Sequence, residues 1–263
     1  MQPPLRIAVL DTDNPSADFQ SKYGTHGDAF IRLLGNASMT LNPPLGPNDL
    51  HFRKWDVVNS SDYYPNIEEV DALIIVGSQD ILDKNATDST PWILKLTDFI
   101  RKVLTEQDRV RVIGVNFGHL IIGRALGCVI ERVLHWEASI STVKLNDIGR
   151  KAYGRDELNI MELHRDNLVT LPVNPFPQLP NAILEIVGET DACAVQGLYT
   201  PGKVISLQGQ PELDVQTMGA LIQERLNSGY FRSDVATDAL NRASWRNDGV
   251  YIAAAFLRFL LEP

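Results

Sequence analysis

The stretch RVIGVNFGHLIIGRALGC, residues Arg111 to Cys128, predicts a buried strand, a tight turn and a helix in immediate succession. Its apolar run Val112–Val115 is typical of an interior strand, and His119–Leu126 continues as an apolar helix with Gly127 as a C-terminal cap. A strand that turns sharply through residues 116–118 into a helix holds one side chain above backbone N–H groups that can bind an oxyanion. The stretch therefore predicts a strand–turn–helix elbow centred on Asn116.

Strands and helices alternate on the N-terminal side of this elbow. Apolar runs at Leu5–Leu10 and Asp71–Val76 predict interior parallel strands, and His51–Val58 predicts another strand. Amphipathic segments at Ala29–Leu34 and from Pro91 to Val103 predict helices between the strands. This alternation predicts a parallel, doubly wound sheet.

After Gly127 the pattern changes to short apolar runs separated by turn residues, which predicts antiparallel strands packed on the same core. The runs are Val129–Leu134, Ser139–Leu145, Leu158–Leu163, Ile183–Val187, Ala192–Val195 and Val204–Leu207. Two helices are expected at the end, Val215–Asn227 and a longer one within Asp234–Leu261. Since the sequence contains no repeat and no linker, residues 1–263 are expected to form a single domain, a three-layer α/β sandwich.

The net charge, the apolar runs and the cysteine count indicate which kinds of binding partner the protein can have. The 263 residues are enough to bury a full core, and 24 Lys and Arg against 33 Asp and Glu give a formal net charge of −9. Because no basic tract offsets this charge, we expect neither nucleic acid nor a membrane as a partner. No apolar run approaches the roughly 18–20 residues of a membrane span, and the start shows no signal peptide. The two cysteines, Cys128 and Cys193, are too few for a disulfide framework, which indicates a cytoplasmic protein.

The elbow resembles that of the class I glutamine amidotransferases. GVNFGHL (114–120) and IIGRALG (121–127) are similar to the family pattern G-[IV]-C-[FYL]-G-H-Q and a helix ending in A-L-G-G. The segment from Gly77 to Val103 resembles the family's T-G-S turn and its P-W-I-x-x-L-x-x-F-I helix. MELHRDNLVTLP (161–172) is similar to H-x-D-x-V-x-x-L-P, and VISLQGQPELD (204–214) to Q-G-H-P-E-F. The resemblance covers most of the chain and implies a flavodoxin-like core with a mostly parallel sheet and added antiparallel strands.

Three positions depart from the family pattern. The resemblance places Asn116 where the family has its cysteine nucleophile, Gln210 where it has its histidine, and Leu120 where it has a substrate-binding glutamine. Amide hydrolysis through a thioester needs a thiolate and an imidazole that activates it, which two amide side chains do not supply. An oxyanion hole alone retains about 10³-fold catalysis over water. We therefore expect no glutaminase activity.

The resemblance also implies the remaining site residues. Glu212 stands at the position of the acidic orienter, and Gly77 and the N–H of Phe117 are implied as oxyanion donors. The expected substrate-binding residues are Gly77, Phe117, Ser78, Gln79, His119, Leu120 and His164, with Glu212, Asn116 and Gln210 as the catalytic candidates. In the family the histidine at position 119 is mostly structural. No cluster has metal-ligand spacing and no glycine-rich phosphate loop is present, so neither a metal nor a cofactor is expected.

Each of these candidates has two interpretations. Asn116 is either a ligand-binding amide or the residue of a decayed site, and Gln210 either binds a ligand with it or bonds only to Asn116. Glu212 is either an acid or base with a raised pKa or a structural carboxylate, and His164 either lines the pocket or is structural. Tyr23, His26 and Asp80 are lesser candidates, because they follow early strands, where open α/β sheets bind ligands.

Two hypotheses about function follow. In the first, the chain is a repurposed enzyme that acts by acid–base or electrostatic chemistry on a small carbonyl-containing metabolite of a biosynthetic pathway. It would be an isomerase, cyclase, lyase or hydrolase. In the second, it is a catalytically inactive pseudoenzyme that binds a metabolite or regulates a partner. A small-molecule ligand is expected in both cases. A homodimer and a separate partner subunit are both left open, since no synthetase domain is fused to the chain.

Overall fold

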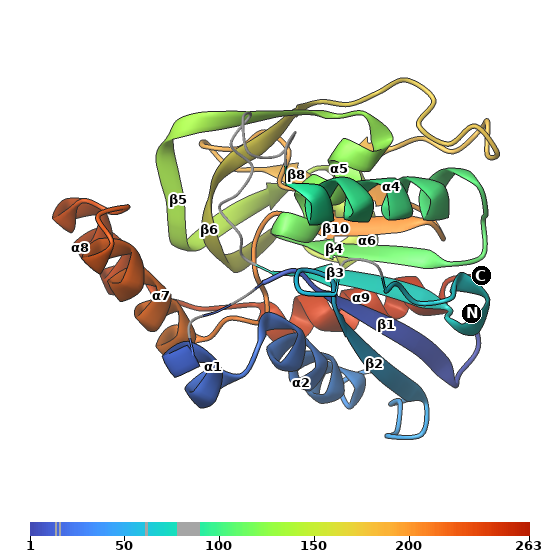
Figure 1. The fold of residues 1–263 in the computed structure, drawn as a ribbon, viewed down its shortest axis with the longest axis horizontal. Helices are drawn as coiled ribbons and strands as arrows, with labels where there is room; N and C mark the ends of the chain where they lie inside the picture. Colours follow the sequence, from blue (N-terminus) through green and yellow to red (C-terminus); the bar gives the residue numbers. More distant parts are fainter. Residues whose placement is uncertain (14, 16, 61–62, 78–89) are drawn as a thin grey trace.

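The computed structural model describes residues 1–13, 15, 17–60, 63–77 and 90–263 and has three layers (Figure 1). Within these residues the central sheet has seven strands in the order β2-β1-β3-β4-β10-β9-β7. Neighbouring strands from β2 to β10 run parallel, and β9 and β7 add antiparallel pairs at one edge. This arrangement confirms the predicted α/β fold. The strands are β1 (Leu5–Asp11), β2 (Leu50–Asp56), β3 (Ala72–Val76), β4 (Arg111–Val115), β7 (Glu185–Ile186), β9 (Gly197–Thr200) and β10 (Val204–Leu207).

Helices cover both faces of this sheet (Figure 1). On one face, α2 (His26–Ser38) packs with α9 (Gly249–Leu261), and the rings of Phe30 and Phe256 lie 6.2 Å apart. On the other face, α4 (Pro91–Thr105) packs with α5 (Phe117–Leu126). Helix α2 begins three residues before the predicted start because Thr25 and Asp28 form a capping box at its first turn.

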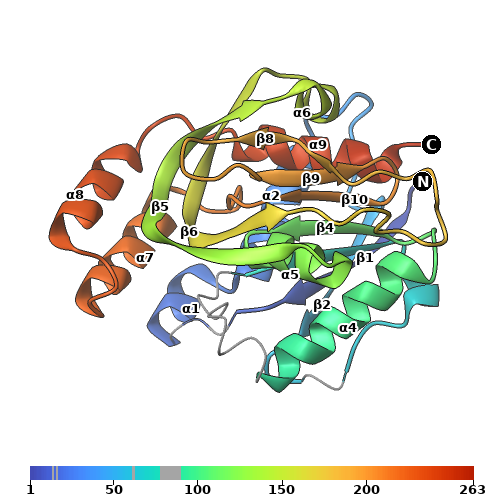
Figure 2. The ribbon, with the colours of Figure 1, turned by 90° about the horizontal axis from the view of Figure 1, so that it is seen from above.

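A second sheet, β6-β5-β8, curves away from the first (Figure 2). Its strands are β5 (Val129–Leu145), β6 (Glu157–Thr170) and β8 (Gly188–Glu189). The two strands predicted within β5 are one long strand, because residues 133–136 form a register shift rather than a break. The outer face of the β5–β6 hairpin packs against α1 (Ala17–Tyr23), α7 (Val215–Asn227) and α8 (Ser233–Arg242).

In the second half two predictions were wrong and one helix was not predicted. The predicted terminal helix is divided into α8 and α9, because Asn247 leaves the helical path to donate to the carbonyl of Leu213 and to accept from the N–H of Gly249. Residues 192–195 form no strand, since they belong to a turn closed by hydrogen bonds between Thr190 and Cys193. A short helix, α6 (Asp147–Tyr153), follows the N-cap residue Asn146 where no helix was predicted. The remaining helical turn is η1 (Ile67–Glu69). No helix in the described ranges is long and apolar enough to cross a membrane.

Candidate functional site

The predicted elbow joins β4 to α5 through Asn116. Its backbone has φ 51° and ψ −107°, a conformation that residues with a side chain rarely adopt. Its N–H donates to the carbonyl of Leu207 in β10 at 2.9 Å. Helix α5 begins directly against β3, and the glycine at position 118 allows this approach. A Cβ on Gly118 would lie only 2.1 Å from the carbonyl oxygen of Ile75. The close approach of strand and helix therefore forces the strained turn.

The amide of Asn116 is oriented by the protein. Its Nδ2 donates to the carbonyl of Gln208 at 3.0 Å, and the residue is 5% exposed. The N–H of Phe117, expected as an oxyanion donor, donates to the carbonyl of Gly77 at 3.4 Å. Both N–H groups at the elbow thus contact main-chain carbonyls of the chain itself. Ser78 and Gln79, which were expected beside them, and Asp80 lie outside the described residues.

Gln210 and Glu212 lie in the loop between β10 and α7. The N–H of Gln210 donates to the carbonyl of Met161 in β6 at 2.7 Å, which holds the loop against the second sheet. The Nε2 of Gln210 donates to Oε1 of Glu212 at 3.3 Å. The oxygen of the Gln210 amide and Oε2 of Glu212 are buried and meet no hydrogen-bond donor among the described residues.

Glu212 is paired with a histidine from a distant element. Nδ1 of His26, the first residue of α2, lies 2.9 Å from Oε1 of Glu212, and its Nε2 lies 3.1 Å from Oδ2 of Asp13. Burial alone would lower the pKa of His26, but the hydrogen bonds to Asp13 and Glu212 outweigh it and raise the pKa to about 10. The ring is therefore an imidazolium between two carboxylates at neutral pH.

A second cluster of the same kind lies on the β5–β6 hairpin. Nε2 of His164 is 3.2 Å from Oε2 of Glu137 and 3.2 Å from Oε2 of Glu162, while its Nδ1 is 3.1 Å from Oδ1 of Asn167. Burial alone would lower the pKa of His164, but the hydrogen bonds to Glu137 and Glu162 outweigh it and raise the pKa to about 10. Burial raises the pKa of Glu162, a fully buried residue, to about 7. Glu137 stays ionised, because the hydrogen bonds from its neighbours outweigh its burial and lower its pKa.

The two clusters meet at the loop that follows β10. A Cβ on Gly209 would lie 2.6 Å from Oε1 of Glu162, so this carboxylate rests against the segment that carries Gln210. The carbonyl of the preceding residue, Gln208, receives the amide of Asn116. The structure thus places Asn116, Gln210 and Glu162 beside one another at the segment 208–210.

His119 and Leu120, both expected to bind substrate, are buried in the molecule. Nδ1 of His119 lies 2.8 Å from Oγ of Ser206, and the ring is fully buried. Burial and the nearby charge of His164 lower its pKa to about 3, so the ring is neutral. Leu120 belongs to the apolar cluster on the α4–α5 face. We assign both residues to the packing of α5 against the sheet.

Three acidic members of the clusters were missed from the sequence, namely Asp13, Glu137 and Glu162. Charged residues at alternate positions of a predicted strand, Glu162 and His164, were the available signal, because they place like polar groups on one buried face. Glu137 gave no such signal, since its pairing with His164 depends on the register shift in β5. Among the described residues, no group of three His, Cys, Asp or Glu side chains could hold a metal ion.

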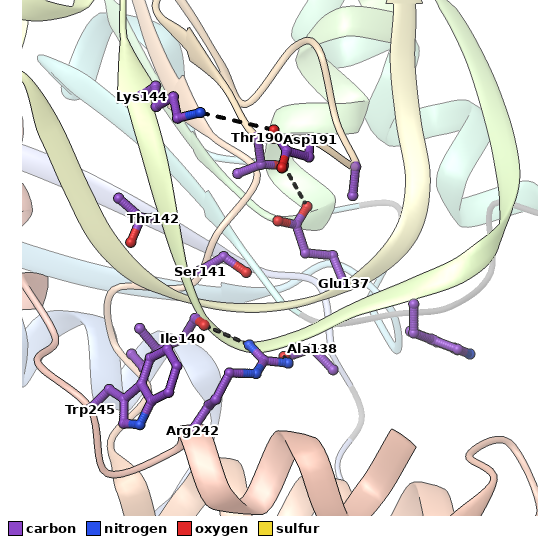
Figure 3. A pocket seen from close by; sticks show the side chains of 12 residues that line it. Glu137, Ala138, Ile140, Ser141, Thr142, Lys144, Thr190, Asp191, Arg242 and Trp245 are labelled. Atoms are coloured by element: carbon purple, nitrogen blue, oxygen red, sulfur yellow. Dashed lines mark hydrogen bonds and ion pairs between the residues drawn. The ribbon is translucent and has the colours of Figure 1, made fainter. Parts of the chain in front are cut away.

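A cavity of about 480 Å³ reaches the outer side of the hairpin cluster (Figure 3). Glu137 forms part of its wall and accepts a hydrogen bond from Oγ1 of Thr190 at 3.1 Å. Arg242 closes another side by donating to the carbonyl of Ile140. Glu137 is therefore the member of the hairpin cluster that lines this cavity.

The fold combines a mostly parallel sheet with polar side chains gathered beside the elbow after β4. No family model matches the chain. A glutamine amidotransferase-like protein of Schizosaccharomyces pombe is 29% identical over 260 residues, which cover 97% of this chain and 98% of that protein. Gamma-glutamyl peptidase 4 of Arabidopsis thaliana is 24% identical over 240 residues, 87% of this chain and 84% of that protein.

The fold agrees with the sequence similarity. The crystal structure of a glutamine amidotransferase from Thermotoga maritima matches with a TM-score of 0.67 at 15% identity, over 97% of this chain and 98% of that one. Along nearly its whole length the chain is thus similar to glutamine amidotransferase-like proteins, and it shares the fold of a solved glutamine amidotransferase.

Proposed function

We propose that this chain is a repurposed enzyme, which binds a small polar metabolite beside the elbow and acts on it by proton transfer, without a thioester. Asn116 at the turn has no ionisable group that could attack an amide. Proton transfer without a covalent intermediate is compatible with an isomerase, cyclase, lyase or hydrolase.

The burial of Glu162 beside His164 supports catalysis. This carboxyl group is fully buried, and burial raises its pKa to about 7. A group with a pKa near the working pH is the most effective general acid or base, because both of its protonation states are populated. Glu162 and Glu212 are both ion-paired with a histidine, but Glu212 also accepts a hydrogen bond from the amide of Gln210 at 3.3 Å. We therefore assign proton transfer to Glu162 and a positioning role to Glu212.

A pseudoenzyme that binds a metabolite or a partner subunit is the second candidate. It is favoured by the hydrogen bond from the N–H of Phe117 to the carbonyl of Gly77, which occupies the donor that a substrate carbonyl would need. The ion pair between His26 and Glu212 likewise satisfies a carboxylate that could otherwise act on a ligand. In this case the site would retain a compound unchanged.

An assay that follows many compounds at once separates the two candidates. Purified protein is incubated with small polar metabolites from a cell extract and with γ-glutamyl compounds, which the similarity to a gamma-glutamyl peptidase suggests as a first choice. Mass spectrometry then follows every compound with time. We expect one compound to be consumed and one product to form, at a rate that falls about 10²–10⁴-fold in Glu162→Gln.

The matched control is Glu131→Gln, an exposed glutamate on the same strand as Glu137. It should turn over the compound at the wild-type rate. Equal rates in Glu162→Gln would assign proton transfer to another group. A compound that is retained by the protein but never converted would replace the enzyme hypothesis by the pseudoenzyme.

A further inference from the structure

We propose that the elbow site recognises a small cation rich in N–H bonds, an amidinium, guanidinium or primary ammonium group, through the amide oxygens of Asn116 and Gln210. This inference rests on the proposed function, for which it names the substrate class. Three observations lead to it: the orientation of the two amides, the unpaired acceptors around them and the net charge of the buried clusters.

The orientation of both amides is fixed by their neighbours. The Asn116 amide faces the carbonyl oxygen of Gln208 at 3.0 Å, and the Gln210 amide faces the carboxylate of Glu212 at 3.3 Å. An amide can approach these oxygens only with its NH₂ end, because an oxygen there would face another oxygen. The two amides therefore have their oxygen ends left for a ligand. An amide oxygen only accepts hydrogen bonds, so the ligand must supply donors.

Several buried acceptors of the site have no donor among the described residues. Gln210 is fully buried, and no described residue donates to its Oε1. The same holds for Oε2 of Glu212, and within the described part of the chain the carboxylate of Glu162 is paired with His164 alone. Buried polar atoms without partners are rare in native proteins, because removing a polar atom from water costs free energy that only a new hydrogen bond offsets. A ligand with several N–H groups would satisfy these acceptors, whereas a ligand that only accepts hydrogen bonds would not.

The charge of the two clusters favours a cation. Each cluster contains one imidazolium between two carboxyl groups: His26 with Asp13 and Glu212, and His164 with Glu137 and Glu162. Two carboxylates against one imidazolium give the His26 cluster one negative charge in excess, and the hairpin cluster reaches the same charge when Glu162 is ionised. The electrostatic attraction of this charge is little screened in a buried site. A cationic ligand is thereby favoured over a neutral one, and an anion is repelled.

Donor groups for a carbonyl or carboxylate ligand are already engaged at the elbow. The N–H of Phe117 and the NH₂ of Asn116 both contact main-chain carbonyl oxygens. A ligand oxygen placed here would have to break one of these bonds and would face the amide oxygens. The same turn that would present a nucleophile in a related enzyme thus presents an acceptor in this chain.

Three probes of the same shape test the inference. Acetamidinium, acetamide and acetate differ in charge and in the number of N–H bonds but share one planar skeleton. Isothermal titration at neutral pH should detect acetamidinium binding at least about tenfold tighter than acetamide, with no binding of acetate. Equal affinity for acetamidinium and acetamide, or tighter binding of acetate, would overturn the inference.

Two variants locate the binding. Gln210→Met keeps the length of the side chain and removes its oxygen, and it should weaken acetamidinium binding about tenfold or more. Asn116→Gly removes the other amide at a position whose positive φ suits glycine, so this variant is expected to fold. Gln223→Met, on the exposed side of α7, is the matched control and should bind as the wild type does. Unchanged affinity in both site variants would overturn the inference.

The outcomes separate this inference from the proposed function. If acetamidinium binds as expected but no metabolite is converted, the ligand class stands and the chain is a binding protein. If a metabolite without a cationic N–H group is converted and acetamidinium neither binds nor inhibits, the ligand class is wrong and the enzyme hypothesis stands.

Discussion

Replacing His26 by leucine should destabilise the protein strongly. The substitution removes the imidazolium whose nitrogens lie 3.1 Å from the carboxylate of Asp13 and 2.9 Å from that of Glu212. Breaking a buried ion pair from one side costs about 3–5 kcal/mol. Since the Asp13 side chain is 13% exposed and retains some hydration, the lower end of this range applies. A domain of this size loses about 2–4 °C of Tm per kcal/mol, so the expected loss is roughly 6–12 °C.

The pH dependence identifies the cause. The pKa of His26 is raised from 6.5 to about 10 in the folded protein. Its contribution to stability is therefore fully present below pH 6.5 and is lost as the pH rises through about 10. Thermal denaturation of wild type and variant across this window should give a Tm difference that shrinks with rising pH. His51→Leu, at an exposed histidine of β2, should show neither effect.

A double variant checks the coupling between the two partners. Adding Glu212→Leu to His26→Leu removes the stranded carboxylate as well, so the two losses should be clearly less than additive. The reasoning would be refuted by a Tm loss of His26→Leu that stays the same from pH 6.5 to 10, or by additive losses.

Purified protein should release no ammonia from glutamine above a buffer control, because Asn116 cannot form a thioester; turnover that disappears in Asn116→Ala would contradict this. Gly118→Ala should lower the free energy of unfolding by about 1–3 kcal/mol, because its Cβ would lie 2.1 Å from the carbonyl oxygen of Ile75. Chemical denaturation measures this free energy. An unchanged midpoint would mean that α5 can move away from β3 without loss of stability. Burial raises the pKa of Cys128 to about 11 and that of Cys193 to about 12, so iodoacetamide at neutral pH should label them only after unfolding. Rapid labelling of the native protein would show that the thiols are accessible.

Local sequence patterns were sufficient for the architecture. The apolar run before Asn116 and the glycine two residues after it predict the elbow, because a strand and a helix can meet so closely only where a side chain is missing. The alternation of apolar strands and amphipathic helices predicts the parallel sheet. Both patterns can be identified from the sequence because each depends only on residues a few positions apart. The division of the terminal helix was not predictable in this way, since Asn247 is drawn away by Leu213, a residue far along the chain.

Only the tertiary structure decided the chemistry of the site. His26 and Glu212 are 186 residues apart in the sequence and 2.9 Å apart in space, so nothing local to either residue reveals their pairing. The register shift in β5 decides that Glu137 lies opposite His164. The sequence determined that Asn116 is an amide at a strained turn, but an amide can donate or accept. Which end remains for a ligand depends on the carbonyl that the fold brings beside it, and that contact is made by the packing of distant strands.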